Sequence, residues 1–365
     1  MTYRSSRMAP TGTTTPPHTP TLPRSRARRT LIIACAALPF WAFALLLAWP
    51  DRPYRIDLLA NFVPHFALAI GLLAVLLTIP RRTRITAPGI ASAAVALALW
   101  HLAHCSPPAP ATPTDRTIRV VHFNAHSERS ANDTAFLAWL RDQDTDLVCL
   151  VETPWSFAAM HPWVRERYPY RVEPSMGLQW PNLLLSKHPL ALKEMEADDP
   201  DHLFSFVARR SVTVSVPGAA PFIWTALHPP SPRRESSWRR ALDEATRDAA
   251  ILARHRALDP TPILVTADFN AAPTARLLQH FTRVSELTAW TPRLAAGTWP
   301  SNLSPWLAVP IDRPATTPEL RVTSLTVGPR FRSDHRPIAF TLALTPAPET
   351  RPNPGISEPP TTPAR

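Results

Sequence analysis

Polar residues end six apolar, β-rich segments of this chain, and all of them are Asn, Asp, Glu or His. Strand ends are where a scaffold usually presents a site. One acidic residue after a strand is ordinary because loops begin with polar residues, but six such endings favour a shared function. The residues are Asn124, Glu152, His228, Asp268 with Asn270, Asp312, and Asp334 with His335.

These side chains supply two kinds of reactive group. Carboxylate and amide oxygens are hard ligands that suit Mg²⁺ or Mn²⁺, and imidazoles move protons or stabilise charge. Other common chemistries have no support, since the chain has only 8 glycines. None of them forms a Gly-x-Ser-x-Gly elbow, a P-loop or a Gly-x-Gly-x-x-Gly turn.

A zinc site is disfavoured. His122 and His126 are four residues apart, and on a strand such a pair lies ~13 Å apart, too far for one ion. The three cysteines, Cys35, Cys105 and Cys149, lie in or beside apolar segments, where a thiol usually acts as a small apolar filler. They form neither a Cys-x-x-Cys pair nor a disulfide framework.

Two short motifs carry a resemblance to a known family. Ala-Asp-Phe-Asn at residues 267–270 is followed by Ala-Ala-Pro, and Ser-Asp-His-Arg-Pro occupies residues 333–337. With the other strand-end residues in order, residues 117–344 resemble the endonuclease/exonuclease/phosphatase family. That family includes DNase I-like nucleases, inositol-phosphate phosphatases and sphingomyelinases. The N-terminal apolar segments make the chain similar to a bacterial membrane-anchored subgroup.

The resemblance implies an α/β four-layer sandwich, in which two packed β-sheets are flanked by helices. It also implies a divalent metal ion, Mg²⁺ or Mn²⁺. By matching positions, Glu152 would be the principal metal ligand, with Asn124 beside it and Asp334 near the ion.

The same resemblance implies roles for five further residues. Asp268 would orient or deprotonate the attacking water, and Asn270 would hold a phosphate oxygen. His335, oriented by Asp312, would contact the scissile phosphate. His228 would stabilise developing charge or protonate the leaving group. The protein would then act by positioning and charge neutralisation more than by covalent chemistry.

Two positions depart from the family pattern. Pro314 follows Asp312 closely, and because proline is poorly placed in a central strand, it predicts an irregular element there. His126 stands where some nucleases have Asp, which leaves the second metal ligand open. Trp299 and Trp306 lie in the loop before Asp312. They could stack on a base or meet a lipid interface, although packing within the loop is favoured.

Three apolar segments, residues 31–49, 58–79 and 85–103, predict three transmembrane helices because a membrane-spanning helix needs about 20 apolar residues. A cleaved signal peptide is the competing interpretation of the first segment. Arginines precede the first segment and lie between the second and third, and arginine-rich loops stay cytoplasmic. The domain would therefore face the periplasm from a bacterial inner membrane. Without the third span it would be cytoplasmic.

The predicted organisation has five parts. A disordered basic cytoplasmic tail (1–29) precedes three membrane helices (30–104) and a Pro-rich linker (105–115). The catalytic domain (116–345) and a disordered tail (346–365) follow. Residues 1–114 hold 11 arginines against two acidic residues, whereas 115–345 hold 26 basic against 24 acidic ones. The pI near 10.7 therefore reflects the N-terminal part and does not indicate nucleic-acid binding.

Periodicity predicts helices at 133–141 and 235–256. It predicts strands at 118–123, 147–151, 182–185, 211–216, 222–227, 263–266 and 338–344. We therefore expect a membrane-anchored, metal-dependent hydrolase of a phosphodiester or phosphomonoester. Its substrate would be nucleic acid, a phospholipid or another phosphate ester, and its other partner the lipid bilayer. The alternative is a catalytically silent binding or scaffold module that keeps the fold.

Overall fold

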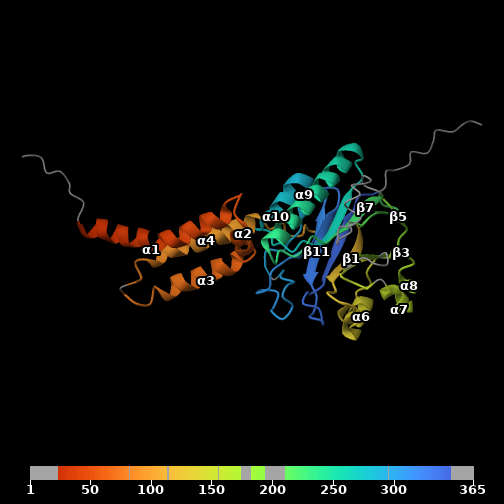
Figure 1. Ribbon diagram of the computed structural model, residues 1–365, viewed down its shortest axis with the longest axis horizontal. Coiled ribbons are helices and arrows are strands. Elements are labelled where there is room, and N and C mark those ends of the chain that lie inside the picture. The colour runs from red at the N-terminus through yellow and green to blue at the C-terminus, as the bar shows by residue number, and fades with distance from the viewer. Residues whose placement is uncertain are drawn as a thin grey trace, which may run out of the picture.

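The computed structural model describes residues 24–81, 83–112, 115–154, 156–173, 182–193, 210–294 and 296–346. Two β-sheets with helices outside them form a domain. The apolar helices within residues 24–103, here called the stem, project from one side of it (Figure 1). The sheets carry the strand ends on which the predicted site residues lie.

The first sheet has six strands in the order β11-β12-β1-β2-β4-β3. β1 and β2 run parallel, and the other neighbours are antiparallel. Its strands are β1 (Arg116–Asn124), β2 (Leu147–Val151), β3 (Tyr170–Val172), β4 (Leu183–Ser186), β11 (Arg321–Val327) and β12 (Ile338–Leu344).

The second sheet also has six strands, in the order β5-β6-β7-β8-β10-β9. β7 and β8 run parallel, as β1 and β2 do in the first sheet, and the other neighbours are antiparallel. Its strands are β5 (Leu190–Leu192), β6 (Arg210–Val214), β7 (Phe222–Leu227), β8 (Ile263–Asp268), β9 (Thr288–Ala289) and β10 (Asp312–Thr316).

The core lies between the sheets, where strands with two buried faces need apolar residues throughout. Val120 and Cys149 from the first sheet pack in one cluster with Trp224 and Leu264 from the second. Trp224 satisfies its ring N–H by donating to Thr266 Oγ1 at 3.0 Å, as a buried indole requires. Cys149 is a fully buried filler of this core, with no exposed surface.

Helices cover the outer face of each sheet. α6 (Thr134–Asp142) packs Phe136 and Leu140 against Phe123 of the first sheet. α9 (Glu235–Leu258) and α10 (Arg276–Ser285) cover the second sheet. The predicted two-sheet sandwich flanked by helices is therefore confirmed. The short helices are α5 (Glu128–Ala131), α7 (Phe157–Met160) and α8 (Pro162–Arg167).

The stem corrects the prediction of three transmembrane helices. α1 (Arg24–Ala48) is long and apolar enough to cross a membrane, over residues 31–48. The second apolar segment is broken into α2 (Tyr54–Ala60) and α3 (Val63–Leu76), bent by 72°. Pro64 at the start of α3 explains the break. Proline has no backbone N–H to donate within a helix, and its ring clashes with the carbonyl group four residues earlier. α4 (Ala87–Ala103) has only 17 residues. The described residues thus contain one membrane-length helix, or two if the bent pair is one span.

The short helix α2 and the residue that follows it form hydrogen bonds with the domain. Asp57 Oδ2 accepts a hydrogen bond from Trp238 Nε1 at 2.8 Å, and its Oδ1 accepts from the backbone N of Arg276 at 2.8 Å. Asn61 Oδ1 accepts from the backbone N of Ala272 at 2.7 Å. The stem therefore holds the loop that follows β8.

Two predicted boundaries also need correction. α1 begins at Arg24, inside the predicted tail 1–29. The predicted linker is not a free spacer, because Ser106 bridges to Trp290 and the backbone N of Ala109 donates to Val322 O at 2.9 Å. Residues 1–23 and 347–365, which contain most of the two predicted tails, lie outside the described residues.

The strand after Ile311 is regular, contrary to the expectation from Pro314. β10 pairs with β8 without a shift, from Asp312 opposite Asp268 to Thr316 opposite Leu264. On its other side β10 pairs with β9 only at Ala315 and Thr316. Pro314 lies outside that pairing, so the N–H that proline lacks is not required there.

Candidate active site

The parallel strand pairs bring four of the predicted residues to one edge of the sandwich. Asn124 ends β1, Glu152 follows β2, His228 follows β7 and Asp268 ends β8. Carboxyl ends of parallel strands meet at the same sheet edge. Asn124 joins the two sheets, since its Nδ2 donates to Asp268 Oδ2 at 2.9 Å and to Glu152 Oε1 at 3.2 Å. Its Oδ1 accepts from the backbone N of His126 at 2.8 Å, which fixes the amide orientation.

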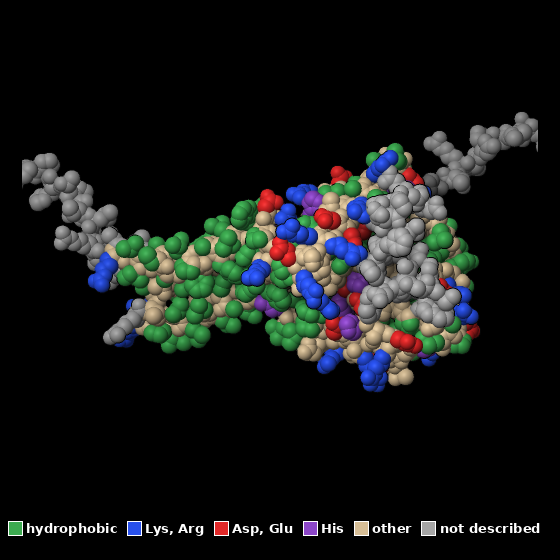
Figure 2. All heavy atoms as spheres, in the orientation of Figure 1, with side chains coloured by type: hydrophobic (Ala, Val, Ile, Leu, Met, Phe, Trp, Pro, Cys, Tyr) green, Lys and Arg blue, Asp and Glu red, His purple; other side chains and the backbone are tan. Residues whose placement is uncertain are grey.

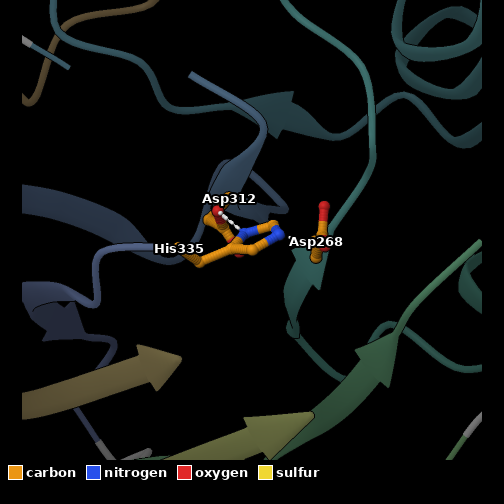
Figure 3. A group of neighbouring side chains, drawn as sticks. All are labelled: Asp268, Asp312 and His335. Atoms are coloured by element: carbon orange, nitrogen blue, oxygen red, sulfur yellow. Dashed lines mark hydrogen bonds and ion pairs between the residues drawn. The ribbon is translucent and has the colours of Figure 1, made fainter. Parts of the chain in front are cut away.

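The antiparallel pairing of β10 with β8 sets Asp312 beside Asp268. His335, in the loop before β12, donates from Nδ1 to Asp312 Oδ2 at 2.9 Å (Figure 3). His122 on β1 approaches the other carboxylate oxygen, Asp312 Oδ1, at 3.3 Å. All four side chains are buried. Asp312 is therefore held between two imidazoles.

This burial and pairing fix the charge states. Burial alone would lower the pKa of His335, but the carboxylates of Asp312 and Asp268 raise it to about 10. Burial also opposes ionisation of Asp312, yet the charge of His335 and the hydrogen bonds of the two imidazoles hold the pKa of Asp312 well below its usual range. Asp312 and His335 therefore form a carboxylate–imidazolium pair at neutral pH.

Asp268 is in the opposite situation. Burial, and then repulsion from Asp312, raises the pKa of its carboxyl. Its Oδ1 accepts from the backbone N of Asn270 at 2.8 Å, while its Oδ2 lies 3.6 Å from His228 Nε2 and 3.7 Å from His335 Nε2. A raised pKa makes a carboxylate a better proton acceptor near neutral pH. Asp268 is thus suited to accept a proton.

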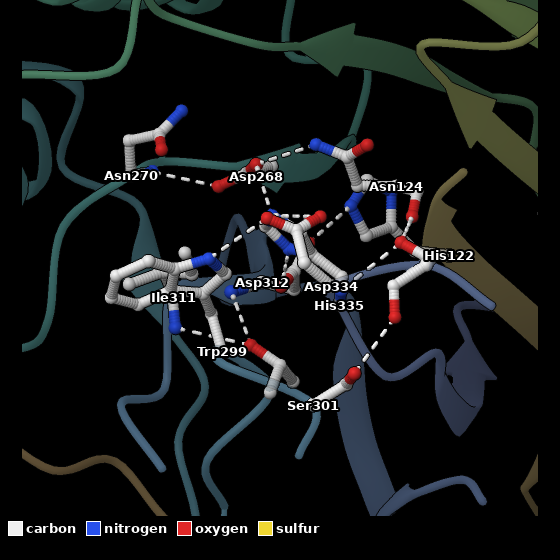
Figure 4. A network of polar contacts seen from close by, with 12 residues as sticks. His122, Asn124, Asp268, Asn270, Trp299, Ser301, Ile311, Asp312, Asp334 and His335 are labelled. Carbon is white, nitrogen blue, oxygen red and sulfur yellow. Dashed lines mark hydrogen bonds and ion pairs between the residues drawn. The ribbon is translucent and has the colours of Figure 1, made fainter. Parts of the chain in front are cut away.

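The outer half of the site is acidic and more exposed. Asp334 Oδ1 lies 3.4 Å from His126 Nδ1, and Glu152 Oε2 lies 3.6 Å from the same nitrogen. Glu152 also contacts His228, with Oε1 at 3.3 Å from Nε2. Trp299 Nε1 donates to Asp334 Oδ2 at 3.1 Å (Figure 4). Two carboxylates therefore flank one half-exposed histidine.

Backbone strain is concentrated here. Three of the five non-glycine residues with positive φ in the described chain are His126 (60°), Glu152 (55°) and Asn270 (50°). Such conformations cost free energy and cluster at functional sites, where surrounding contacts maintain them. At Asn270 the amide Nδ2 donates to Pro229 O at 3.1 Å, which ties the loop after β8 to the loop after β7.

One group of donors has the spacing of a metal site: Asp268, Asp312 and His335 each offer one ligand atom, and these atoms lie within 4.8 Å of one another. Glu152 and Asp334 are further candidate ligands, because both carboxylates approach His126 Nδ1, at 3.6 and 3.4 Å. Asp334 Oδ1 is shielded from solvent and accepts no hydrogen bond from the residues that the structure describes, which is the condition of an acceptor suited to a cation. Oxygen donors of this kind match Mg²⁺ or Mn²⁺.

All eight residues predicted as site residues lie in this one network. The sequence did not predict where two histidines lie: His122 was considered only in a zinc pair, and His126 also as a departure at a metal-ligand position. His122 lies beneath Asp312, and His126 lies between Glu152 and Asp334. A signal for His122 exists, because it is two residues before Asn124 on β1 and therefore points to the same face.

The structure is a two-sheet α/β sandwich with a cluster of buried carboxylates and imidazoles at one edge. The family model described as "Endonuclease/Exonuclease/phosphatase family" matches residues 121–335, more than half of the chain. The chain belongs to the endonuclease/exonuclease/phosphatase family and is a hydrolase of phosphoric ester bonds.

Several solved structures are similar in fold. An endonuclease/exonuclease/phosphatase from Beutenbergia cavernae has 19% identity and a TM-score of 0.45, covering 63% of this chain and 72% of that one. The human Nocturnin catalytic domain with bound sulfate has 18% identity and a TM-score of 0.49, covering 66% and 100%. Truncated Caenorhabditis elegans TDP2 has 15% identity and a TM-score of 0.47, covering 62% and 98%. No curated protein sequence matches the chain.

Proposed function

We propose that this chain is a membrane-anchored phosphoesterase that uses a divalent metal ion to hydrolyse a phosphodiester or phosphomonoester with water. One observation carries the proposal. A buried carboxylate with a raised pKa, Asp268, lies beside the Asp312–His335 ion pair and is joined through Asn124 to the more exposed Glu152. A proton acceptor, a fixed positive charge and a metal-binding edge thus adjoin one another.

We assign the metal ion to Glu152 and Asp334, with Asn124 orienting Glu152 through its amide. The buried group is less suitable, because His335 carries a proton at neutral pH and its Nδ1 already bonds Asp312 Oδ2. Glu152 and Asp334 are partly open to solvent, so a substrate phosphate can reach them. When bound, the ion would polarise the phosphoryl group and neutralise its charge.

The protein's own residues would carry the proton and position the phosphate. Water attacks phosphorus and gives its proton to Asp268. The bond between phosphorus and the leaving oxygen breaks, and His228 protonates that oxygen. His335, held by Asp312, contributes positive charge to the phosphate, and Asn270 holds a phosphate oxygen. These roles follow the distances of the site and the family resemblance.

We also propose that the stem enters a lipid bilayer. Leu38 and Leu45 of α1 are each 66% exposed, and apolar side chains cover the stem surface (Figure 2). The N-terminal end of α1, which holds Arg28, and the turn between α3 and α4, which holds Arg81 and Arg84, lie at the end of the stem away from the domain (Figure 1). At the domain end, the charge of Arg52 is paired with Asp57. Because arginine-rich ends stay cytoplasmic, the domain would face the periplasm of a bacterial inner membrane.

The test uses the full-length protein in detergent, because α2 is bonded to the domain. Hydrolysis of a soluble bis-aryl phosphodiester, plasmid DNA and phospholipid would be measured with Mg²⁺, Mn²⁺ or EDTA. We expect at least one substrate to be cleaved with metal and not with EDTA. Glu152→Gln and His335→Asn should abolish cleavage, while Glu166→Gln on the surface of α8 should not. Equal inertness of all proteins would favour the scaffold alternative.

A further inference from the structure

A cluster of large apolar side chains is exposed in the loop between β9 and β10. Residues 299–307, here the 299–307 loop, include Trp306 at 66% exposure and Leu307 at 49%, with Leu303 and Trp299 also exposed. Soluble proteins scatter such residues singly, and a contiguous group marks an interaction site. Packing within the loop therefore does not account for Trp306.

The 299–307 loop is braced on the active site. Trp299 Nε1 donates to Asp334 Oδ2 at 3.1 Å. Ser301 donates from its backbone N to Asp334 O at 2.7 Å and from its hydroxyl to Ser333 O at 2.7 Å (Figure 4). The first residues of the loop, Trp299 and Ser301, therefore contact the Ser-Asp-His motif.

The other end of the loop reaches the stem. His65, in the first turn of α3, donates from Nε2 to Leu307 O at 2.7 Å. Phe62 just before it, and Leu68 and Leu72 further along α3, are exposed apolar residues. The apolar surface of the stem thus continues onto the loop, and in Figure 2 the hydrophobic surface extends from the stem to the adjoining edge of the domain.

The loop is held in shape rather than being a loose segment. Trp299 and Val309 pair across its base, with N–O distances of 3.1 and 2.6 Å. The backbone N atoms of Leu307 and Ala308 both donate to Ser304 O at 2.9 Å, which closes a turn at the tip. A turn fixed in this way presents Trp306 and Leu307 outward without further ordering, which lowers the cost of binding.

We propose that the 299–307 loop rests in the surface of the bilayer that holds the stem and presents the active site to phosphate esters in the lipid headgroup layer. The occupant is a lipid surface because the loop adjoins the stem, and because indole rings favour the interface between water and hydrocarbon. This proposal rests on the proposed function. It narrows the substrate class to a phospholipid or another membrane-borne phosphate ester.

The first experiment measures the position of the loop in full-length protein in phospholipid nanodiscs. A nitroxide label at exposed Ser304→Cys, in a Cys35→Ser background, would be compared with a label at Leu258→Cys. The other two cysteines are buried. Leu258 ends α9, ~30 Å along that helix from Trp238, which donates to Asp57 of the stem. We expect the Ser304 label to collide with oxygen more than with a water-soluble nickel complex. Equal water access at both positions overturns the proposal.

The second experiment compares two rates in the same nanodiscs, hydrolysis of the bilayer phospholipid and of the soluble bis-aryl phosphodiester. Trp306→Ser with Leu307→Ser should lower the ratio of lipid to soluble rates by about tenfold, since the apolar contact with the bilayer is lost. The matched control, Leu192→Ser with Leu258→Ser, alters two residues elsewhere that are more exposed, at 72% and 78%, and should keep the ratio.

The outcomes separate the two proposals. Wild type that cleaves the soluble diester but no lipid, or an unchanged ratio in the loop variant, overturns the role of the loop and leaves the phosphoesterase proposal standing. Wild type that cleaves neither substrate with any metal overturns the proposed function itself.

Discussion

At the residue scale, the site holds two buried carboxyl groups whose pKa values are shifted in opposite directions. Asp312 is fully ionised because two imidazoles contact it, whereas Asp268 resists ionisation because it is buried beside Asp312. Paired titratable groups whose environments push their pKa values apart are how one site holds both a fixed charge and a proton acceptor. The more exposed Glu152 and Asp334 remain for a cation.

Metal binding should depend on the exposed pair and not on the buried one. Glu152→Gln should weaken Mn²⁺ binding at least about tenfold, because it removes a charged oxygen ligand. Asp312→Asn should change the affinity by less than about threefold, since its carboxylate serves His335. Titration of the Mn²⁺ electron paramagnetic resonance signal measures both without any turnover. The opposite order of effects would move the ion to Asp268, Asp312 and His335.

The Asp312–His335 pair should make stability depend on pH in the alkaline range. The pKa of His335 is raised from 6.5 to about 10, so its contribution is complete below pH 6.5 and is lost as pH rises through about 10. His335→Asn should therefore be destabilised by about 3 kcal/mol at pH 6, and the difference from wild type should shrink toward pH 10. Thermal unfolding across this range measures it, with His280→Asn on the surface of α10 as the control. A difference independent of pH would contradict a charged His335.

That the eight predicted residues would lie together could be inferred from the sequence, because most of them end or follow short apolar strands and two of the motifs are specific. Strand-end position is a local property, so it can be read along the chain. The contact of His122 with Asp312 could not be predicted in the same way, because it joins residues 190 positions apart across two sheets. Only the packing of one sheet on the other determines how close His122 and Asp312 lie.

At the element scale, the strands of the core were the easiest to predict. β7 and β12 have the predicted bounds, since their residues are apolar and β-branched or aromatic and are bounded by turn residues. α10 was not predicted, although Leu277, Leu278 and Phe281 have helical spacing and are buried. The bent second apolar segment was misjudged because hydropathy alone does not register Pro64.

α2 should behave as a part of the catalytic domain. Arg52 donates to Asp57 at 2.8 Å and to Thr274 O at 2.6 Å, and both charged side chains are buried. Asp57→Ala would leave Arg52 unpaired and Trp238 without its acceptor, so we expect a loss of about 3–5 kcal/mol in stability. Thermal unfolding of the full-length protein measures this.

The matched control for α2 is Asp51→Ala, because Asp51 is exposed and its ion pair with Arg276 is long, at 3.4 Å. That variant should lose less than about 1 kcal/mol. Equal stability of Asp57→Ala and wild type would show that the contacts of α2 do not stabilise the domain. The same contacts predict that a fragment beginning at residue 115 unfolds at a lower temperature than the full chain.

At the scale of the whole molecule, the stem and the domain have opposite surfaces. The domain buries its apolar residues between and outside its sheets, whereas the stem exposes leucines along α1, α3 and α4 (Figure 2). Such a surface needs a covering, and a bilayer would supply it in the proposed arrangement, because α1 has an apolar stretch of 18 residues that is long enough to cross one. The high pI reflects residues 1–114, which hold 11 arginines against two acidic residues.

Insertion of α1 should therefore fail when its exposed face is charged. Leu38→Arg with Leu45→Arg puts two charges seven residues apart, on one face of the helix. The charge at position 38, near the middle of the 31–48 span, costs roughly 2.5–3.5 kcal/mol, and the charge at position 45, nearer its end, costs less. We expect the variant to leave the membrane pellet under alkaline carbonate extraction, whereas wild type stays. Leu192→Arg with Leu258→Arg, at equally exposed positions of the domain, should stay in the pellet. Retention of the α1 variant in the pellet would mean that α1 does not anchor the chain, and its apolar face would then need a protein partner.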